Sequence, residues 1–564
     1  MITRLFYLQV IKHDFFKQKS SGQLKKVIHI QPHRGHIFDR HGAVLAMSRE
    51  AYSIYATPQA VRNIEKTALT LAKILNENPI EIQKKLASKQ NFVWIKRRVL
   101  PDLKEAIDQA KLSGINAIQE EKREYPRGQL AADMIGFVGL DGGLAGLEYQ
   151  FDSRLKGSPA KIIIEGDPSG FRLISSKANI LGRPKGFKFG SRHVEPASFD
   201  GDHVYTTIDS FIQYSAESHL AKQIEEMEAI SGQVIVMNPQ TGEVLAMADF
   251  PTFNPQFFFE STQSILKNSC IVDVFEPGSI FKLVTMSAAI EERIVEPDSM
   301  VTIPETLQLA NRTIRESHPR SEDEKDRDDK PASEILVHSL NVGTTLLAQS
   351  IGDKKFYSYI KRFGFGQRYG VQLPGESNGI LRHVDRWSAV DIGMMSFGQG
   401  VGVTPLQMVS AGSVIANGGY LIKPRIIHSV SDYEGVTVKA NQKQVLRRVV
   451  KEATAFKVKQ MLEAAVFEGT GQRAKIPGYR IMGKTGTAQV AGPGGVGYLK
   501  GEYIASFLGF FPFDQPKYVI LVSIHSPKKY ISGGMVSAPV FKRIAQDIIH
   551  YYNIPPDAIE ANET

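Results

Sequence analysis

Apolar and polar residues in the first part of the chain follow patterns that predict a small mixed module. In residues 67–75 and 80–87, apolar side chains recur every three or four positions, which is typical of amphipathic helices. Residues 92–95 form a short continuous apolar run that favours a strand. Because residues 60–115 hold no cluster of nucleophiles or metal ligands, we expect this mixed α/β module to be structural.

The second part of the chain, from residue 204, predicts strands at both ends with helices between them. Asp209 is a suitable N-cap for the first of these helices. The predicted elements are a helix at 211–227, a hairpin of 232–237 and 243–248, strands at 506–511 and 518–524, and a closing helix at 540–551. This order predicts an α+β domain, in which helices flank an antiparallel sheet.

A basic, glycine-rich stretch between residues 166 and 202 separates the two parts and is typical of a linker or a ribbon. Residues 554–564 follow the last predicted helix, and we interpret them as a polar tail. We therefore predict four parts: an N-terminal segment at 1–26, a first domain at 27–200, a catalytic domain at 201–553 and a polar tail at 554–564.

Composition and charge narrow the possible partners. With 564 residues, of which 42% are hydrophobic and 23% charged, the chain is an ordinary globular protein with room for more than one core. Its formal net charge of +9 suits an anionic membrane surface or cell-wall polymer. Because no basic run is interleaved with aromatic residues, we expect no nucleic-acid partner.

Cysteine and histidine do not predict a metal site. Cys270 is the only cysteine, so no intrachain disulfide can form, and we expect a small buried thiol there. His29, His33, His36 and His41 crowd one strand-like stretch without any cysteine beside them. We interpret them as structural or surface histidines, and we expect neither a metal nor an organic cofactor.

Ser279 and Lys282 are the first candidate for chemistry. Pro277 and Gly278 indicate a turn, and the apolar residues after it recur at helical spacing, namely Leu283, Met286, Ala289 and Ile290. A serine and a lysine three positions apart share one helix face, so the amine can reach the hydroxyl. A desolvated lysine can then take the proton that makes the serine a nucleophile.

The spacing alone proves little, because it recurs at Ser153/Lys156, Ser158/Lys161, Ser264/Lys267, Ser358/Lys361 and Ser526/Lys529. Two further motifs distinguish Ser279. Ser339 and Asn341 form a serine-x-asparagine motif, and residues 484–487 read lysine-threonine-glycine-threonine. In this order, the three motifs are those of penicillin-binding proteins and class A β-lactamases.

With these motifs, the chain resembles the class B penicillin-binding proteins, and most closely their division-specific, septal peptidoglycan D,D-transpeptidases. The resemblance extends over residues 34–46, 139–157, 396–400, 404–408, 416–419 and 533–541. It implies a β-lactamase-like transpeptidase domain, preceded by an extended mixed α/β pedestal known as the dimerisation domain. It also implies an acyl-enzyme that cross-links stem peptides during septal cell-wall synthesis and that β-lactam antibiotics trap.

The family's roles transfer to matching positions. Ser279 is expected to be the nucleophile, Lys282 its base, and Ser339 the relay that protonates the departing D-alanine amine. The backbone N–H groups of Ser279 and Thr487 are expected to form the oxyanion hole. The substrate-binding residues implied in the same way are Asn341 for the peptide amide, Lys484, Thr485 and Thr487 for the terminal carboxylate, and Gly486 for close approach of the peptide.

The resemblance also implies a location and partners. Family members carry a single membrane helix before the pedestal, with the catalytic domain on the outer face of the inner membrane. Residues 5–11 are apolar but far short of the roughly 20 residues that a spanning helix needs. We therefore expect the anchor helix to be missing from this sequence. The implied partners are stem peptides, β-lactams, a membrane glycosyltransferase and other division proteins.

Three alternatives share parts of this pattern. A β-lactamase has the same motifs, but the long upstream module and the lack of an obvious water-activating glutamate argue against it. An elongation-specific class B transpeptidase and a catalytically inactive division scaffold are the others.

The charged run 315–330 contains no apolar residue apart from Pro319. This composition predicts a solvated surface loop near the cleft.

Overall fold

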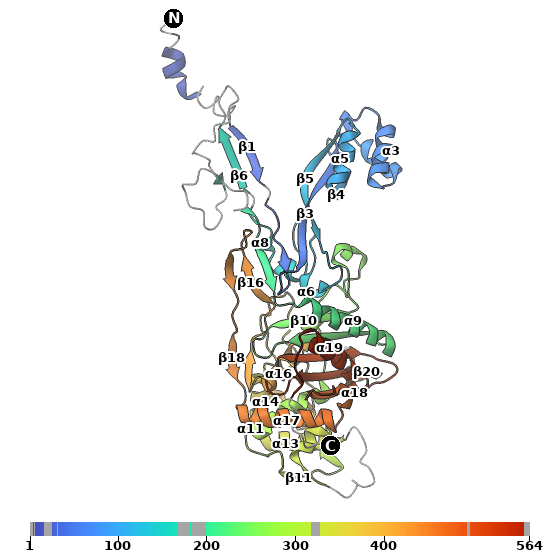
Figure 1. Ribbon diagram of the computed structural model, residues 1–564, viewed down its shortest axis with the longest axis vertical. Coiled ribbons are helices and arrows are strands. Elements are labelled where there is room, and N and C mark those ends of the chain that lie inside the picture. The colour runs from blue at the N-terminus through green and yellow to red at the C-terminus, as the bar shows by residue number, and fades with distance from the viewer. Residues whose placement is uncertain are drawn as a thin grey trace.

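The protein consists of a body from which two arms diverge (Figure 1). The computed structural model describes residues 4, 6–15, 25–30, 32–158, 160–165, 180–181, 199–316, 328–492 and 497–557. One arm contains β1 and β6, and the other contains β3, β4 and β5 with the helices at its tip (Figure 1). The body contains the sheet and helices that follow residue 208.

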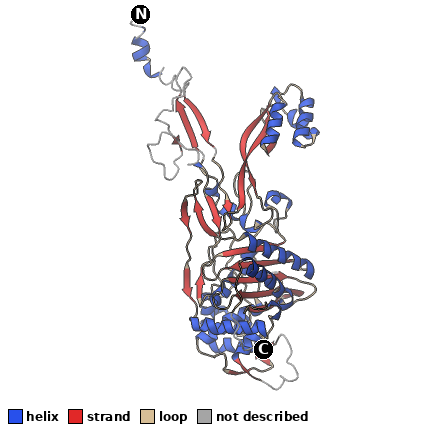
Figure 2. Cartoon of the chain, viewed as in Figure 1, coloured by secondary structure: helices blue, strands red, loops and turns tan. Residues whose placement is uncertain are grey.

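A five-stranded antiparallel sheet forms the centre of the body, in the order β10-β9-β21-β20-β19. Figure 2 shows its strands with helices on both sides. The strands are β9 (Ser231–Met237), β10 (Val244–Phe250), β19 (Met482–Ala491), β20 (Tyr498–Phe511) and β21 (Tyr518–His525). The third sequence motif therefore lies on β19, an edge strand.

Alternation along the strands divides the apolar side chains between the two faces of this sheet. Val234 and Val236 of β9 pack into a core with α9 (Ser210–Met227) and α19 (Ala538–Tyr551). Ile235 and Met237 belong to a larger core on the other face. The helices on that side include α10 (Ser269–Val272), α11 (Lys282–Glu291), α16 (Pro405–Ala416) and α17 (Glu452–Phe467).

Further short elements complete the two cores of the body. The helices are α12 (Ala332–Val337), α13 (Asn341–Ile351), α14 (Asp353–Arg362), α15 (Asp391–Ser396) and α18 (Gly533–Val536), with 3-10 turns η4 (Pro255–Glu260), η5 (Gly278–Phe281), η7 (Val384–Arg386) and η8 (Gln472–Ala474). The strands are β11 (Met300–Thr302), β12 (Thr306–Leu309), β13 (Arg312–Arg315), β14 (Asp329–Pro331), β15 (Tyr420–Ile422) and β18 (Val445–Arg448).

The arm with helices at its tip has a core of its own. Strand β3 (Val44–Ala56) pairs with both β4 (Val93–Val99) and β5 (Ile115–Glu124). Helices α3 (Ile64–Leu75), α4 (Pro79–Leu86) and α5 (Pro101–Gln109) bury apolar side chains against these strands, with the 3-10 turn η2 (Pro58–Ala60) beside them. These elements confirm the mixed module predicted for residues 60–115.

The other arm is a three-stranded sheet in the order β1-β6-β7, built from β1 (Lys25–Ile30), β6 (Ala160–Glu165) and β7 (Ile180–Leu181). Most of the predicted linker at 166–202 lies outside the described residues, as do residues 558–564 of the tail. Near the N-terminus, Tyr7–Ile11 form the single short turn η1. Within the described part of the chain, no helix is both long enough and apolar enough to cross a bilayer.

A second sheet joins the arms to the body. It runs β17-β16-β8-β2-β3-β4, and it combines β2 (Ile37–Phe38) with β8 (His203–Thr206), β16 (Ile427–Ser431) and β17 (Thr437–Ala440). Strands β2 and β8 are parallel, so positions 37 and 204 lie side by side although 167 residues separate them. The domain boundary predicted at residue 200 lies just before β8, which pairs with β2 of the first domain. Its position stays a prediction.

A buried ion-pair cluster stabilises this joint. Glu148 is fully buried and accepts from Arg34 (Nη2 to Oε2, 2.7 Å) and from Arg123 (Nε to Oε1, 2.6 Å). Arg34 also pairs with Asp152 at 2.7 Å. The short helices around the cluster are α6 (Ala132–Ile135), α7 (Gly146–Gln150) and α8 (Asp152–Leu155). The segments 34–46 and 139–157, which the sequence singled out separately, therefore meet through matched charges.

The predicted elements of the body are confirmed with small changes in their bounds. The helix predicted at 211–227 is α9, and the Asp209 carboxylate accepts from the N–H groups of Phe211 and Ile212, as an N-cap does. The hairpin of 232–237 and 243–248 is the pair β9 and β10. The predicted strand 506–511 is only the inner half of β20, which begins at Tyr498.

Candidate active site

A cavity of about 740 Å³ brings the three sequence motifs together. Ser279 of the first motif, Ser339 of the second, and Thr485 and Thr487 of the third all line it. The two motif lysines are buried, with exposed fractions of 1% for Lys282 and 0% for Lys484. Residues that lie far apart in the sequence thus form one site with hydroxyl groups at its wall and buried amines.

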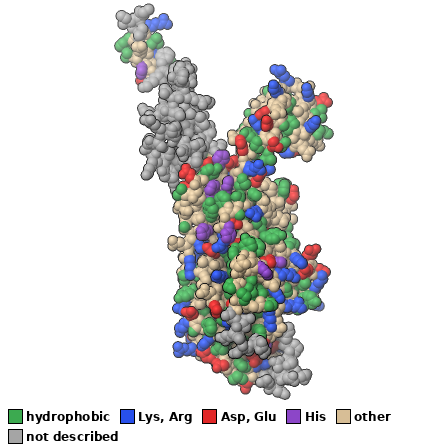
Figure 3. Space-filling model, viewed as in Figure 1, with side chains coloured by type: hydrophobic (Ala, Val, Ile, Leu, Met, Phe, Trp, Pro, Cys, Tyr) green, Lys and Arg blue, Asp and Glu red, His purple; other side chains and the backbone are tan. Residues whose placement is uncertain are grey.

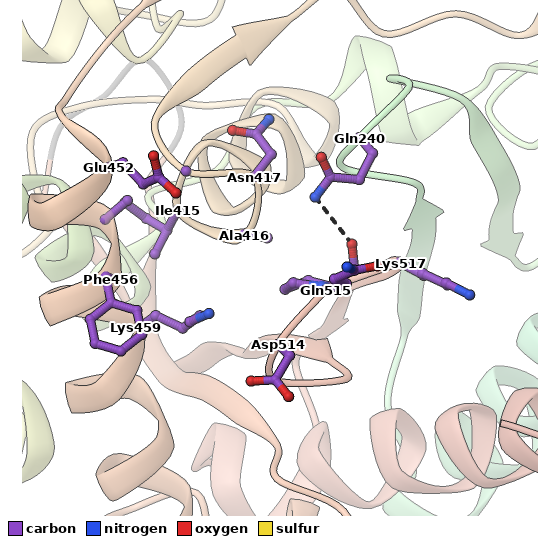
Figure 4. A pocket seen from close by; sticks show the side chains of 13 residues that line it. Gln240, Ile415, Ala416, Asn417, Glu452, Phe456, Lys459, Asp514, Gln515 and Lys517 are labelled. Carbon is purple, nitrogen blue, oxygen red and sulfur yellow. Dashed lines mark hydrogen bonds between the residues drawn. The ribbon is translucent and has the colours of Figure 1, made fainter. Parts of the chain in front are cut away.

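A second cavity, of about 390 Å³, contains none of the motif residues in its wall. It lies between the end of α16, the first half of α17 and the turn at 514–517 (Figure 4). The Lys459 ammonium extends toward it and donates to the Phe513 carbonyl at 2.9 Å. Gln240 donates to the Pro516 carbonyl at 3.4 Å. The larger cavity is therefore the candidate active site.

Ser279 lies in the 3-10 turn η5, directly before α11. Residues three apart eclipse one another in a 3-10 turn, which places Ser279 on the same side as Lys282. Gly278, with φ of +56°, lets the turn approach β19 closely, because a Cβ there would lie 3.0 Å from the Thr487 carbonyl oxygen. The Gly278 N–H donates to the Gly398 carbonyl at 3.1 Å. The close approach to β19 on one side and the hydrogen bond to Gly398 on the other thus fix the position of Ser279.

Lys282 connects the first motif to the second. Its Nζ donates to the Ser339 carbonyl at 2.6 Å, to the Asn341 Oδ1 at 2.7 Å and to the Ser339 Oγ at 3.3 Å. Burial lowers the pKa of Lys282 well below its usual value, and the positive charge of Lys484 lowers it further, whereas Glu316 raises it. The amine is therefore biased toward its neutral form, in which it can accept a proton.

The second motif forms the tight connection between α12 and α13. Ser339 has φ of +63°, a left-handed conformation that is uncommon for a residue other than glycine, and α13 begins at Asn341. This bend directs both the carbonyl and the hydroxyl of Ser339 toward Lys282. Backbone strain of this kind clusters at functional sites.

The third motif places a cation and two hydroxyl groups on the edge strand. Burial lowers the pKa of Lys484 to about 7. The hydroxyl of Thr485 lies 2.6 Å from that of Thr470, and the Thr487 Oγ1 accepts from the Gly533 N–H at 3.3 Å. A Cβ at Gly486 would lie 2.3 Å from the Ser506 Oγ and 3.0 Å from the Pro277 carbonyl oxygen. The packing of the protein itself therefore requires this glycine.

Sequence reasoning missed two glutamates, of which one binds the second motif and the other lies just before the first. Glu316 lines the cavity and accepts from the N–H groups of Asn341 and Val342. Glu276 accepts from the Gly400 N–H at 2.8 Å and from the Tyr498 hydroxyl at 3.0 Å. Glu276 is three residues before Ser279, and that proximity was the available signal.

The charged run 315–330 borders the cleft as expected, and Arg315, Asp328 and Asp329 are exposed, but the expectation of a solvated side chain is wrong for Lys330. Glu316 and Lys330 line the cavity, and Lys330 is buried, with 8% exposed. Residues 317–327, between them, lie outside the described residues. The charged composition misled because side chains at each end contact the second motif or the cavity wall, and a local pattern cannot reveal such contacts.

Cys270 and the N-terminal histidines have the structural roles predicted for them. Cys270 is fully buried, its thiol donates to Asp249, and burial raises the pKa of that thiol. His33 pairs with Glu121, and the ring of His36 lies 5.0 Å from that of His203. Figure 3 shows histidines gathered where the arms join the body. The side chain of His29 lies outside the described residues.

Two family models match the chain in the order that the fold shows. Residues 29–184 match the penicillin-binding protein dimerisation domain. Residues 232–546 match the penicillin-binding protein transpeptidase domain, so this second match includes all three motifs. Both matches confirm the fold class inferred from the sequence.

Relatives and solved structures agree with these models. The chain is 31% identical to stage V sporulation protein D of Bacillus subtilis over 98% of its length and 84% of the relative. It is also 31% identical to the peptidoglycan D,D-transpeptidase FtsI of Escherichia coli, over 100% of this chain and 91% of the relative.

A crystal structure of penicillin-binding protein 3 from Mycobacterium tuberculosis, complexed with ampicillin, matches with a TM-score of 0.72 and 28% identity. The match covers 95% of this chain and 98% of that one. Together with the geometry of the three motifs, these similarities establish that the chain belongs to the class B penicillin-binding proteins, with a dimerisation domain followed by a transpeptidase domain.

Proposed function

We propose that this protein is a serine D,D-transpeptidase that cross-links peptidoglycan stem peptides through an acyl-enzyme on Ser279. One observation carries the assignment. The buried Lys282 amine follows Ser279 by three residues and donates to both Ser339 and Asn341, so the first two motifs converge on a single proton-transfer group. The family match and the relatives named peptidoglycan D,D-transpeptidase support the same reaction.

Acylation begins with proton transfer from the Ser279 hydroxyl to the neutral Lys282 amine. The Ser279 Oγ attacks the carbonyl carbon of the penultimate D-alanine, and the C–N bond to the terminal D-alanine breaks. Lys282 returns the proton through the Ser339 hydroxyl, 3.3 Å from its Nζ, to the departing amine. An ester on Ser279 and free D-alanine are the products of this step.

The third motif holds the substrate during this step. Protonated Lys484 supplies positive charge for the terminal carboxylate, and the hydroxyls of Thr485 and Thr487 donate hydrogen bonds to it. The N–H groups of Ser279 and Thr487 stabilise the oxyanion. Lys484 also favours the neutral form of Lys282, because its positive charge lowers the pKa of that amine. Asn341 holds the peptide amide.

An amine of a neighbouring stem peptide completes the cycle by attacking the ester. Its nitrogen forms the new amide bond, the Ser279 oxygen leaves, and the proton lost by the amine returns to Ser279 through Lys282. A β-lactam also forms an ester with Ser279. Its departing nitrogen stays attached to the acyl group, so the acceptor amine cannot reach the ester. Glu316 lines the cavity with both oxygens accepting from backbone N–H groups, so it lacks the freedom of a water-activating base.

We further assign the enzyme to septal synthesis during division, with its catalytic domain on the outer face of the inner membrane. The similarity to FtsI and to stage V sporulation protein D supports this role. A membrane glycosyltransferase and other division proteins would contact the arms. Depletion in the source bacterium separates the two branches of the family: filaments support the septal role, and rounded cells indicate elongation instead.

Acylation by a fluorescent penicillin tests the assignment of the nucleophile. Purified protein is labelled, and the adduct is followed by fluorescence and intact mass in the wild type, in Ser279→Ala and in Ser358→Ala. Ser358 is the matched control, because it has the same spacing to Lys361 but is exposed on α14. We expect one stable adduct on the wild type and on Ser358→Ala, and none on Ser279→Ala.

Each other outcome has a definite meaning. An adduct that persists in Ser279→Ala refutes the assignment of Ser279 as the nucleophile. A label that forms and disappears within seconds identifies a β-lactamase. A folded wild type that takes no label favours the inactive scaffold.

A further inference from the structure

The end of β13 contacts the second motif at three points. Glu316 accepts from the N–H of Asn341 and, at 2.9 Å, from the N–H of Val342. The Arg315 carbonyl accepts from the Asn341 Nδ2 at 3.0 Å. Asn341 and Val342 are the first two residues of α13, whose N–H groups have no partners within the helix. A carboxylate from 25 residues away therefore caps this helix.

These contacts fix the orientation of the groups that hold Lys282. The Asn341 amide has one donor end and one acceptor end, and because its Nδ2 faces Arg315, its Oδ1 is directed at the Lys282 Nζ, 2.7 Å away. Ser339, two residues before Asn341, has its left-handed conformation directly before the start of α13. Without the cap, the groups of Ser339 and Asn341 that accept hydrogen bonds from Lys282 would be free to move.

The charge of Glu316 also acts on the Lys282 amine, since it raises the pKa that burial and Lys484 lower. Lys484 faces Lys282 from β19, and Glu316 faces it from the end of β13. The other titratable side chains that line the same cavity are Lys330, His338, Glu468 and Tyr503. Glu316 is thus the carboxylate that opposes the effect of Lys484.

We propose that Glu316 is a positioning residue for acyl transfer, which holds the Ser339–Asn341 turn against Lys282 through its hydrogen bonds to the start of α13 and keeps a negative charge near that amine. The proposal rests on the proposed function. It assigns Glu316 no contact with the stem peptide. A helix cap alone would contribute to stability, but a cap next to the general base also affects the reaction.

The test compares the pH dependence of penicillin acylation in the wild type and in Glu316→Gln. The amide is nearly isosteric, retains one oxygen as an acceptor and removes the negative charge. We expect the second-order acylation constant at pH 7 to fall about tenfold, as expected for loss of a charge-assisted hydrogen bond. The acid limb should move to lower pH by about one unit, because loss of an opposite charge favours the neutral amine.

Two further variants separate positioning from general stability. Glu316→Asp retains the charge, so its acid limb should stay where the wild type has it while the rate falls less than in Glu316→Gln. Glu305→Gln removes an exposed carboxylate just before β12 and should change neither quantity. Thermal unfolding confirms that each variant is folded before its kinetics are compared.

An acid limb that stays in place in Glu316→Gln overturns the proposal, whether or not the rate falls, because a purely structural cap would affect only the rate. A rate within twofold of the wild type also overturns it. If the wild type itself forms no adduct, the proposed function fails. If the wild type is acylated and Glu316→Gln behaves like it, only this inference fails.

Discussion

Two of the places where this protein buries charged side chains differ in how the charges are matched. At the joint of the arms, Glu148 is buried between Arg34 and Arg123, and each arginine donates directly to it. In the cleft, Lys282 and Lys484 are buried together, and the hydrogen bonds from Lys282 in the described structure go to uncharged acceptors. The first arrangement is matched, and the second is not.

The difference teaches which buried charges serve the fold and which serve the reaction. A buried charge that lacks a counter-ion has a displaced pKa, and such groups cluster at functional sites. Burial lowers the pKa of Lys484 to about 7 and displaces that of Lys282 in the same direction. Burying Lys282 and Lys484 together therefore lowers the stability of the fold and makes Lys282 a better base. Glu148 and its arginines, in contrast, hold the joint together.

The largest effect is expected from removing the general base. Lys282→Met retains the length of the side chain but has no amine, and the acylation constant for penicillin should fall about 10³-fold. Stopped-flow or quench labelling measures it. Lys361→Met, which removes the half-buried lysine of the Ser358 motif copy, is the control and should acylate normally. A loss of less than tenfold in Lys282→Met would remove Lys282 from the mechanism.

Breaking the matched cluster should give the largest loss of stability. Glu148→Ala leaves the buried Arg123 guanidinium without a carboxylate partner and Arg34 with Asp152 alone, and it should lower the free energy of unfolding by about 3–5 kcal/mol. Urea denaturation measures this change, and the acylation constant of the folded fraction should remain that of the wild type. Replacing Glu81, whose pair with Lys84 is exposed, should leave the free energy of unfolding nearly unchanged. Equal losses from the two substitutions would contradict the role of the joint.

Lys484→Met should affect activity and stability in opposite directions. Acylation should fall about 10–100-fold, because a charge-assisted contact with the substrate carboxylate is lost. The melting temperature should rise, because the pKa of Lys484 is lower in the folded protein than in the unfolded chain. The stability gained should be absent above the usual lysine pKa, grow as the pH falls toward 7 and then level off. A lower melting temperature at pH 7 would contradict this expectation.

The smallest effect is expected at the hydrogen bond behind the nucleophile. Tyr498→Phe removes the hydroxyl that donates to Glu276 at 3.0 Å, but it leaves the Gly400 N–H on the same carboxylate. A neutral donor of this kind contributes about 1 kcal/mol, so acylation should fall by less than about tenfold. The same penicillin assay measures it, and Tyr551→Phe, at an exposed tyrosine, is the control.

The sequence predicted the central sheet and the three motifs because both depend on local patterns. The apolar runs at 232–237 and 243–248 lie within one hairpin, which the structure contains as β9 and β10. The Pro-Gly turn before Ser279 and the apolar helix after it are equally local. Helix α11 differs from the expectation in one respect, since it is buried on almost every side, which suits its place inside the larger core.

Contacts between distant segments could not be predicted from such patterns. Glu316 lies in a charged run that is typical of a solvated loop, and only the fold brings it to the start of α13. The parallel pairing of β2 with β8 likewise joins residues that no local period connects. The segments 34–46 and 139–157 were recognisable separately, but the Arg34 to Glu148 ion pair between them was not.

The pH dependence of the wild-type acylation constant tests the role of the unmatched lysines most directly. Lys282 must be neutral to take a proton, so the constant should rise with pH through its lowered pKa. Lys484 must be charged to bind the carboxylate, so the constant should fall again above its pKa of about 7. A bell with its alkaline limb near neutral pH is the predicted result. A constant that rises without a maximum up to the pKa of an ordinary lysine would contradict it.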